Sequence, residues 1–385
     1  MQPLPPDEAS DFSEGRRHVL LSLAGVLALS ACGGGSAEGA SSTPVQGAPA
    51  RLRISGADIL GPDGKPLTLR GWNWGRWGIT QPDDAARNGS EGANCVRIPL
   101  RWWGYYDGKG IDSRDDAQTA TAGIDPGHLA ILDGMVEQAS KAKLWIILFI
   151  DSNCGQDGTQ GAPADLSMVQ YCDPKGLYPN GHNFWTDPDA RARFIEAWKF
   201  IAARYKDTPY LGMFEPLPEP NPASADDADI TTFYGQVMTA LRPVAPGIPF
   251  LLGPRLYKMT DASKAYNTAW SDVVYTGDLF VHTGGTQAQN IADLTTRLQA
   301  LVDLRAANRV PVFVQQAGVQ SGEDPDLAYL DALLPLLNQN GVGYTYWMYR
   351  DTLNPDAYGV IYQDGNGGWI TKQPFLDAIS ASFKA

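Results

Sequence analysis

The chain has 385 residues, of which 43% are hydrophobic and eleven are Trp, and its formal net charge is −13. This composition is typical of a globular protein with a sizeable core. The negative charge argues against nucleic acid or anionic lipid as a partner, and it is compatible with uncharged substrates such as glucans.

The N-terminal residues 1–32 have the pattern of an export signal. Arg16 and Arg17 precede an apolar run over residues 19–31, which is too short to span a bilayer as a permanent helix. The run ends in Leu-Ser-Ala-Cys32 followed by three glycines. This resembles a bacterial lipoprotein signal, in which the cysteine is acylated. The alternative is an ordinary signal peptide cleaved nearby, and the arginine pair has a weak similarity to a twin-arginine signal.

Residues 33–50 are rich in Gly, Ser, Ala and Pro, which predicts a flexible tether. We expect the protein in a bacterial cell envelope, lipid-anchored at the outer membrane, or secreted, with the lipid as its membrane contact. Such compartments are oxidising. We therefore expect a disulfide between Cys154 and Cys172, which flank a Gly-rich loop, with two free thiols as the alternative. Cys95 lies in an apolar segment and is expected to be buried.

From residue 51 onward, short apolar runs alternate with amphipathic helical patterns. Residues 51–59 and 66–70 flank Gly-Pro-Asp-Gly at 61–64, a turn sequence that predicts a short β-hairpin. The predicted strands are 67–73, 95–99, 145–150, 211–217, 250–253, 279–282, 312–315 and 343–349. The predicted helices include 126–141, 188–205, 230–242, 291–306 and 327–340.

Continuous apolar strands of this kind are typical of a parallel sheet buried on both faces. Eight such strands with intervening helices favour an α/β fold, a (β/α)8 TIM barrel, as one domain over residues 51–385. A doubly wound sheet is the alternative. It would require a Gly-rich phosphate loop after the first strand, and residues 71–78 are too aromatic for that.

In a (β/α)8 barrel the functional site lies at the C-terminal ends of the strands. Polar and indole side chains gather at the predicted ends: Trp72, Asn73, Trp74, Arg97, Arg101, Trp102, Trp103, Asp151, Ser152, Asn153, Glu219, His282, Gln316, Trp347 and Tyr349. Aromatic faces stack on the apolar faces of sugar rings, and polar groups hold the hydroxyls. A single Trp is more often a packing residue, but this gathering indicates a sugar-binding cleft.

At these residues the chain resembles glycoside hydrolase family 5, the cellulase and endoglucanase-like barrels. Residues 69–75, Leu-Arg-Gly-Trp-Asn-Trp-Gly, are similar to the first-strand motif of the family, and residues 95–102 to its second-strand motif. Residues 212–220 resemble its fourth-strand motif, 280–282 its sixth and 344–347 its eighth. The resemblance implies that Glu219 is the acid/base and that Gln316 occupies the nucleophile position. The expected substrate-binding positions are Trp74, Arg97, Trp102, Asn153, Pro218, His282 and Trp347.

Several positions depart from the family pattern. Pro218 replaces the Asn that holds the substrate's 2-hydroxyl, Ser152 replaces a third-strand His, and Gly284 replaces a Tyr. Around the nucleophile, Gln-Gln-Ala-Gly at 315–318 replaces Gly-Glu-Phe-Gly. Retaining glycosidases use two carboxyl groups about 5 Å apart. An amide at Gln316 can neither attack the anomeric carbon nor raise the pKa of Glu219 by like charge, so ordinary retaining hydrolysis is expected to be impaired.

Three hypotheses remain. The first is a protein that binds a β-linked glycan or oligosaccharide with weak or no glycosidase activity. The second is an active β-glycosidase with Glu219 as acid, in which either Gln316 orients a substrate acetamido group or Asp151 activates a water. The third is a surface scaffold for a protein partner. We expect a monomer without cofactor, metal or nucleic acid, and we expect Glu215 to be a structural carboxylate held by Arg97.

Overall fold

The computed structural model describes residues 50–75, 79–100, 122, 124, 126–150, 177–178, 182–183, 185, 188–220, 225–254, 269–281, 285–319, 324–351 and 358–385. The elements below belong to one compact unit within Pro49–Ala385. The predicted signal peptide with Cys32 and the tether up to residue 49 lie outside the described residues, as do Cys154 and Cys172.

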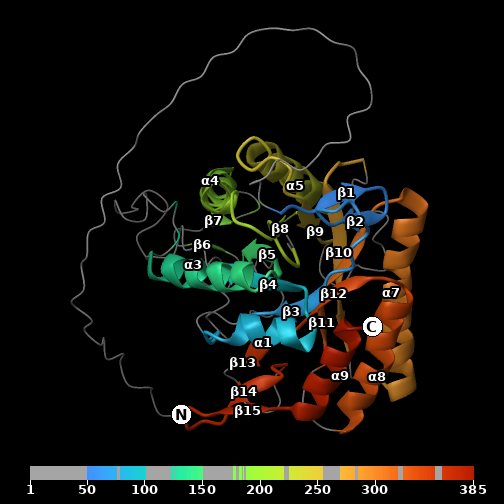
Figure 1. Ribbon diagram of the computed structural model, residues 1–385. Helices are drawn as coiled ribbons and strands as arrows, with labels where there is room; N and C mark the ends of the chain where they lie inside the picture. Colours follow the sequence, from blue (N-terminus) through green and yellow to red (C-terminus); the bar gives the residue numbers. More distant parts are fainter. Residues whose placement is uncertain are drawn as a thin grey trace, which may run out of the picture. The chain divides into compact units, whose positions relative to one another are not determined.

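Eight parallel strands close into a barrel (Figure 1). In order around the barrel they are β3 (Arg70–Asn73), β4 (Cys95–Leu100), β5 (Trp145–Ile150), β8 (Leu211–Glu215), β9 (Phe250–Leu252), β10 (Val273–Phe280), β11 (Val312–Gly318) and β12 (Gly343–Tyr346). Each strand pairs in parallel with the next, and β12 pairs with β3. The predicted (β/α)8 barrel is confirmed.

Helices lie between the strands and pack on the outside of the barrel. They are α1 (Asp84–Glu91), α3 (Pro126–Lys141), α4 (Pro188–Tyr205), α5 (Asp227–Leu241), α7 (Gln287–Asn308), α8 (Asp324–Gln339) and α9 (Gln373–Phe383). The helices α5 and α7 begin three or four residues before the predicted apolar pattern. Each opens with a capping box, Asp226 with Asp229 and Thr286 with Gln289, so the first turn is polar. In the part of the chain that the structure describes, none of the helices is long and apolar enough to cross a bilayer.

The barrel interior is apolar toward the N-terminal ends of the strands. Alternate residues point inward, and one apolar cluster contains Leu69, Cys95, Trp145, Ile147, Met213, Leu251, Val274 and Phe313. Burial raises the pKa of the Cys95 thiol, and the expected burial of Cys95 is confirmed. Leu52 and Ile59, from the N-terminal hairpin, belong to the same cluster.

The hairpin differs from its prediction. Its strands are β1 (Arg53–Ser55) and β2 (Asp58–Leu60), and they are joined at Gly56, whose φ of 57° lies in the left-handed region that glycine tolerates. The predicted turn at 61–64 instead leads to a single bridge between Leu60 and Pro66. The segment 51–59, which was predicted as one arm of the hairpin, is therefore divided at Gly56 into the two strands β1 and β2.

Two short sheets complete the described elements. One joins β13 (Arg350–Asp351), β14 (Ile361–Gln363) and β15 (Trp369–Thr371), and the other joins β6 (Leu177–Tyr178) and β7 (His182–Asn183). The predicted strand 279–282 was placed too late, because β10 begins at Val273. Its polar residues Thr276 and Asp278 and a bulge between Gly277 and Asp278 interrupt the apolar run.

Candidate active site

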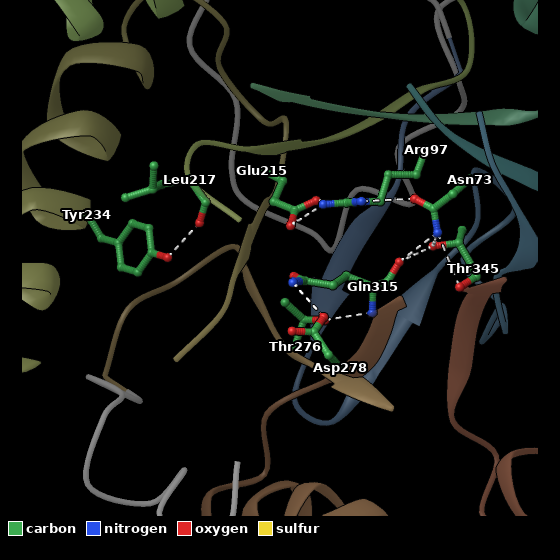
Figure 2. A network of polar contacts seen from close by, with 9 residues as sticks. All are labelled: Asn73, Arg97, Glu215, Leu217, Tyr234, Thr276, Asp278, Gln315 and Thr345. Carbon is green, nitrogen blue, oxygen red and sulfur yellow. Dashed lines mark hydrogen bonds and ion pairs between the residues drawn. The ribbon is translucent and has the colours of Figure 1, made fainter. Parts of the chain in front are cut away.

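A buried ion pair between β4 and β8 lies at the centre of the polar half of the barrel (Figure 2). The guanidinium of Arg97 donates to both carboxylate oxygens of Glu215, with Nε–Oε2 at 2.5 Å and Nη2–Oε1 at 2.8 Å. Both side chains have no exposed surface. Burial raises the pKa of Glu215, and the charge and hydrogen bonds of Arg97 oppose that shift. The prediction that Arg97 holds Glu215 is confirmed.

Asn73 extends this network across the barrel to β11 and β12. Its Oδ1 accepts from Arg97 Nη1 at 2.9 Å, and its Nδ2 donates to the Gln315 carbonyl at 3.0 Å and to Thr345 Oγ1 at 3.0 Å. Arg97 also stacks on the Phe149 ring, with Cζ 3.6 Å from the ring centroid. The side chains of Asn73, Arg97 and Glu215 thus have hydrogen-bond partners, as burial requires. This buried network connects β3, β4, β8, β11 and β12 directly below the C-terminal ends of the strands.

The segment that carries Glu219 follows β8 and is held from outside the barrel. Trp198 of α4 donates its indole N–H to the Pro216 carbonyl at 3.0 Å. Tyr234 of α5 donates to the Leu217 carbonyl at 2.9 Å and also approaches the Gly253 carbonyl. Glu219 itself has φ of 46°, a strained conformation for a residue with a side chain. These contacts hold the backbone before Glu219, which is a half-buried residue at the rim of the barrel.

Glu219 forms a side-chain hydrogen bond with Asp278 of β10. Burial raises the pKa of Glu219 well above its ordinary range, and the charge of Asp278 and the bond to it raise it further. Burial also raises the pKa of Asp278, whereas its bonds to Glu219 and Gln315 oppose that shift. A hydrogen bond between two carboxyl groups requires a proton on the pair. The sequence analysis considered a like charge beside Glu219 only from position 316, whereas the structure has one on β10, at Asp278.

The end of β11 carries two amides. Gln315 is 1% exposed and donates from Nε2 to Asp278 Oδ1 at 2.9 Å, while its backbone N–H donates to Thr276 Oγ1 at 2.9 Å. Gln316 is 7% exposed, and no hydrogen bond joins its side chain to another described residue. The β11–β12 register shifts between Val314 and Ala317. Such irregularities re-aim side chains next to active sites.

Trp347 follows β12 at the same end of the barrel. Its side chain is half-buried, and its backbone N–H donates to the Ala317 carbonyl at 2.8 Å. A Cβ at Gly75 would lie 2.7 Å from the Trp347 indole. Glycine at position 75 therefore lets this ring lie against the backbone after β3, where it can offer a face to a sugar.

Trp74 does not take part in this site. It is 3% exposed and belongs to the apolar layer between the barrel and the helices, where its indole N–H donates to Asn88 of α1 at 2.8 Å. Residues alternate between the two faces of a strand, so Trp74 points outward where Asn73 points inward. The prediction that Trp74 binds substrate is corrected on this ground. Pro218 is buried in the held segment before Glu219.

Three of the predicted substrate-binding residues, Trp102, Asn153 and His282, lie outside the described residues, as do Asp151 and Ser152. Asp278 was missed by the sequence analysis. An acidic residue inside the otherwise buried strand Val273–Phe280 was the available signal. Within the described ranges, no three His, Cys, Asp or Glu side chains form a group that could hold a metal ion.

The site combines a carboxyl pair, a buried ion pair below it and an indole at the strand ends of a parallel barrel. This combination is compatible with a glycosidase site. The sequence profile of cellulase, glycosyl hydrolase family 5, matches residues 60–352. Because this match covers more than half of the chain, the protein belongs to glycosyl hydrolase family 5. A search of curated proteins found no match.

Solved structures share the fold. An endogalactoceramidase has a TM-score of 0.67 at 15% identity, over 86% of this chain and 84% of that chain. Endoglucanase Cel5A from the hyperthermophilic Thermotoga maritima has a TM-score of 0.59 at 16% identity, over 81% and 96%. The same enzyme in complex with mannotriose has a TM-score of 0.60 at 16% identity, over 81% and 97%. At such identities the likeness establishes the fold alone.

Proposed function

We propose that this protein binds a β-linked oligosaccharide at the C-terminal end of its barrel and does not hydrolyse it by the ordinary retaining mechanism. The observation that carries the proposal is the pair of buried amides, Gln315 and Gln316, at the end of β11. Retaining hydrolysis requires a second carboxylate that attacks the sugar. In another enzyme of covalent mechanism, loss of the nucleophile lowers turnover on the order of a millionfold.

The rest of the site supports sugar binding. Trp347 lies half-buried against Gly75, and Glu219 and Asp278 form a carboxyl pair at the same end of the barrel. Solved complexes of Thermotoga maritima Cel5A contain mannotriose and cellobiose. These ligands support an oligosaccharide as the class of ligand, since the fold is shared.

The test combines calorimetry and enzyme assays on the purified protein. Cello-, manno- and N-acetylgluco-oligosaccharides are titrated, and chromogenic β-glycosides are assayed in parallel. Binding without turnover is expected. Trp347→Ala should abolish binding, whereas Trp270→Ala should not, because Trp270 is a half-buried Trp that precedes β10 at the other end of the barrel. Rapid turnover of aryl β-glucosides by the wild type would overturn the proposal.

A second candidate is hydrolysis in which the substrate supplies its own nucleophile. The observation that favours it is the contact of Glu219 with Asp278, because burial and this contact raise the pKa of Glu219 and so favour an acid where a protein nucleophile is missing. The acetamido oxygen of a 2-acetamido sugar would attack the anomeric carbon while Glu219 gives its proton to the departing glycosidic oxygen. Turnover restricted to N-acetylated substrates in the same assays would favour this candidate.

We further propose that the protein is an exported lipoprotein acylated at Cys32. The apolar run at residues 19–31, the Leu-Ser-Ala-Cys box and the glycines behind it support this. Cys32→Ala should leave the precursor unprocessed and should abolish partitioning into the detergent phase. A variant that still partitions with membranes would place the anchor elsewhere.

A further inference from the structure

The pairing of β10 with β11 places a carboxyl group beside the position that lacks one. Asp278 is the Cα partner of Gln316 across this ladder, and the ladder is irregular between Gly277 and Asp278. The Asp278 side chain is held by Gln315, whose Nε2 donates to Oδ1 at 2.9 Å (Figure 2). The carboxyl group that β11 has lost is therefore present one strand away, on β10.

In the described part of the chain, two cationic side chains that face this carboxyl group have other partners. The Arg97 guanidinium from β4 binds both oxygens of Glu215 from β8. The Arg297 guanidinium from α7 donates to the carbonyls of Asp278 and Phe280 at 3.3 and 2.6 Å, and it pairs with Asp293. Two carboxylates in contact repel each other strongly when both are ionised. A hydrogen bond between Glu219 and Asp278 therefore requires one shared proton.

We propose that Asp278 takes over the electrostatic role of the missing β11 carboxylate, sharing one proton with Glu219 and holding Glu219 as a carboxylic acid. Asp278 is thus a positioning residue that acts through Glu219. This deepens the proposed function, on which its relevance to glycan binding rests. The pair holds one O–H and one anionic acceptor. A sugar oxygen that accepts this O–H in place of Asp278 leaves the Asp278 carboxylate free to accept from a neighbouring hydroxyl or amide N–H.

The same arrangement predicts how binding depends on pH. Below the pH at which the pair loses its shared proton, Glu219 donates to the ligand. Above that pH, two anions face each other and the ligand loses its donor, so affinity falls. A pair without a shared proton would instead give binding that does not change through this range. Among the described residues, the groups that face the pair include Arg97, Glu215, Gln315 and Arg297.

Infrared titration of the ligand-free protein tests the shared proton directly. A protonated carboxyl band should persist well above the pH of about 4.3 at which an ordinary Glu titrates. The band should lose the contribution of one carboxyl group in Glu219→Gln, and it should titrate at lower pH in Asp278→Asn, which keeps the shape but removes the charge. Asp278→Glu should retain the band at elevated pH. Asp293→Asn is the matched control and should leave the titration unchanged, since Asp293 contacts Arg297 from the exposed side.

Two results would overturn the inference. One is a wild type whose Glu219 is fully ionised above the ordinary range. The other is a folded Asp278→Asn variant whose Glu219 titrates as in the wild type. Because these spectra require no ligand, they separate this inference from the proposed function. Glycan binding with an unshifted titration would refute the proton sharing alone, whereas a shared proton without glycan binding would refute the proposed function alone.

Discussion

The ends of β8 and β11 face the same barrel mouth but differ in chemistry. Glu215 ends β8 and is paired with Arg97, and Glu219 follows in the next segment, where burial and Asp278 raise its pKa. At the end of β11 the chain has Gln315 and Gln316. One strand end therefore carries carboxyl groups, and the other carries neutral amides. The difference teaches that the buried polar network of this barrel persists without a carboxylate at position 316.

The persistence has a physical cause. Arg97 and Glu215 are completely buried and satisfy each other, and Asn73 ties them to the Gln315 carbonyl of β11. Removing one partner of such a pair leaves an uncompensated buried charge. The network therefore constrains the sequence whether or not catalysis occurs. The Gln316 side chain is under no comparable constraint from the described residues.

Glu215→Gln is expected to give the largest effect. It leaves the buried guanidinium of Arg97 without its counter-charge, which should lower the free energy of unfolding by about 3–5 kcal/mol. Urea denaturation measures this loss. Asp133→Asn is the matched control, because Asp133 pairs with Arg204 where both side chains are 39% exposed, and it should cost less than about 1 kcal/mol. Similar losses in both variants would contradict the structural role of the buried pair.

Gln316→Glu should place a carboxylate at the end of β11, so that both strand ends carry a carboxyl group. The new carboxylate could attack the sugar while Glu219 donates its proton, so hydrolysis of aryl β-glucosides should rise by at least about tenfold, or 1.4 kcal/mol of barrier. The gain should stay partial, because Pro218 cannot hold the 2-hydroxyl and contacts to that group contribute several kcal/mol in this chemistry. Gln299→Glu, on the exposed side of α7, is the control.

The double variant Gln316→Glu with Asp278→Asn sharpens the same comparison. It moves the carboxylate from β10 to β11 without adding charge to the site. It should hydrolyse faster than the single variant, in which three carboxyl groups crowd together. A single variant that matches the double would show that Asp278 is electrostatically remote from position 316. A wild type that already turns over well, and is slowed by the added Glu, would favour a mechanism that uses the amide.

Much of the fold followed from the sequence because the strands are continuous apolar runs separated by helices. The helices Pro126–Lys141 and Pro188–Tyr205 have their predicted limits. The site was harder to predict, since neighbours across a barrel depend on register. Asp278 was missed because its strand was expected to begin at residue 279, and bulges in β10 and β11 decide which side chains meet. Trp74 was misplaced because motif position does not reveal whether a side chain points inward.

Glu219→Gln should give the smallest effect, and its sign depends on pH. Because the pKa of Glu219 is higher in the folded protein than in the unfolded chain, the folded state binds more protons between those two pKa values. The free energy of unfolding therefore falls as the pH rises through that window. Glu219→Gln removes the free-energy cost of ionising this buried carboxyl group in the folded protein. It should be more stable than the wild type above the window, by on the order of 1 kcal/mol.

That advantage should vanish as the pH falls to about 4.3, where a glutamate of the unfolded chain also becomes protonated. Thermal melts at a series of pH values measure the difference. Glu137→Gln is the control, because Glu137 is 63% exposed in a pair with Lys141, and it should show no such window. A Glu219→Gln variant that is less stable than the wild type at neutral pH would mean that Glu219 is ionised and stabilising there. The β8 end would then carry a structural carboxylate instead of an acid, and the contrast with β11 would be lost.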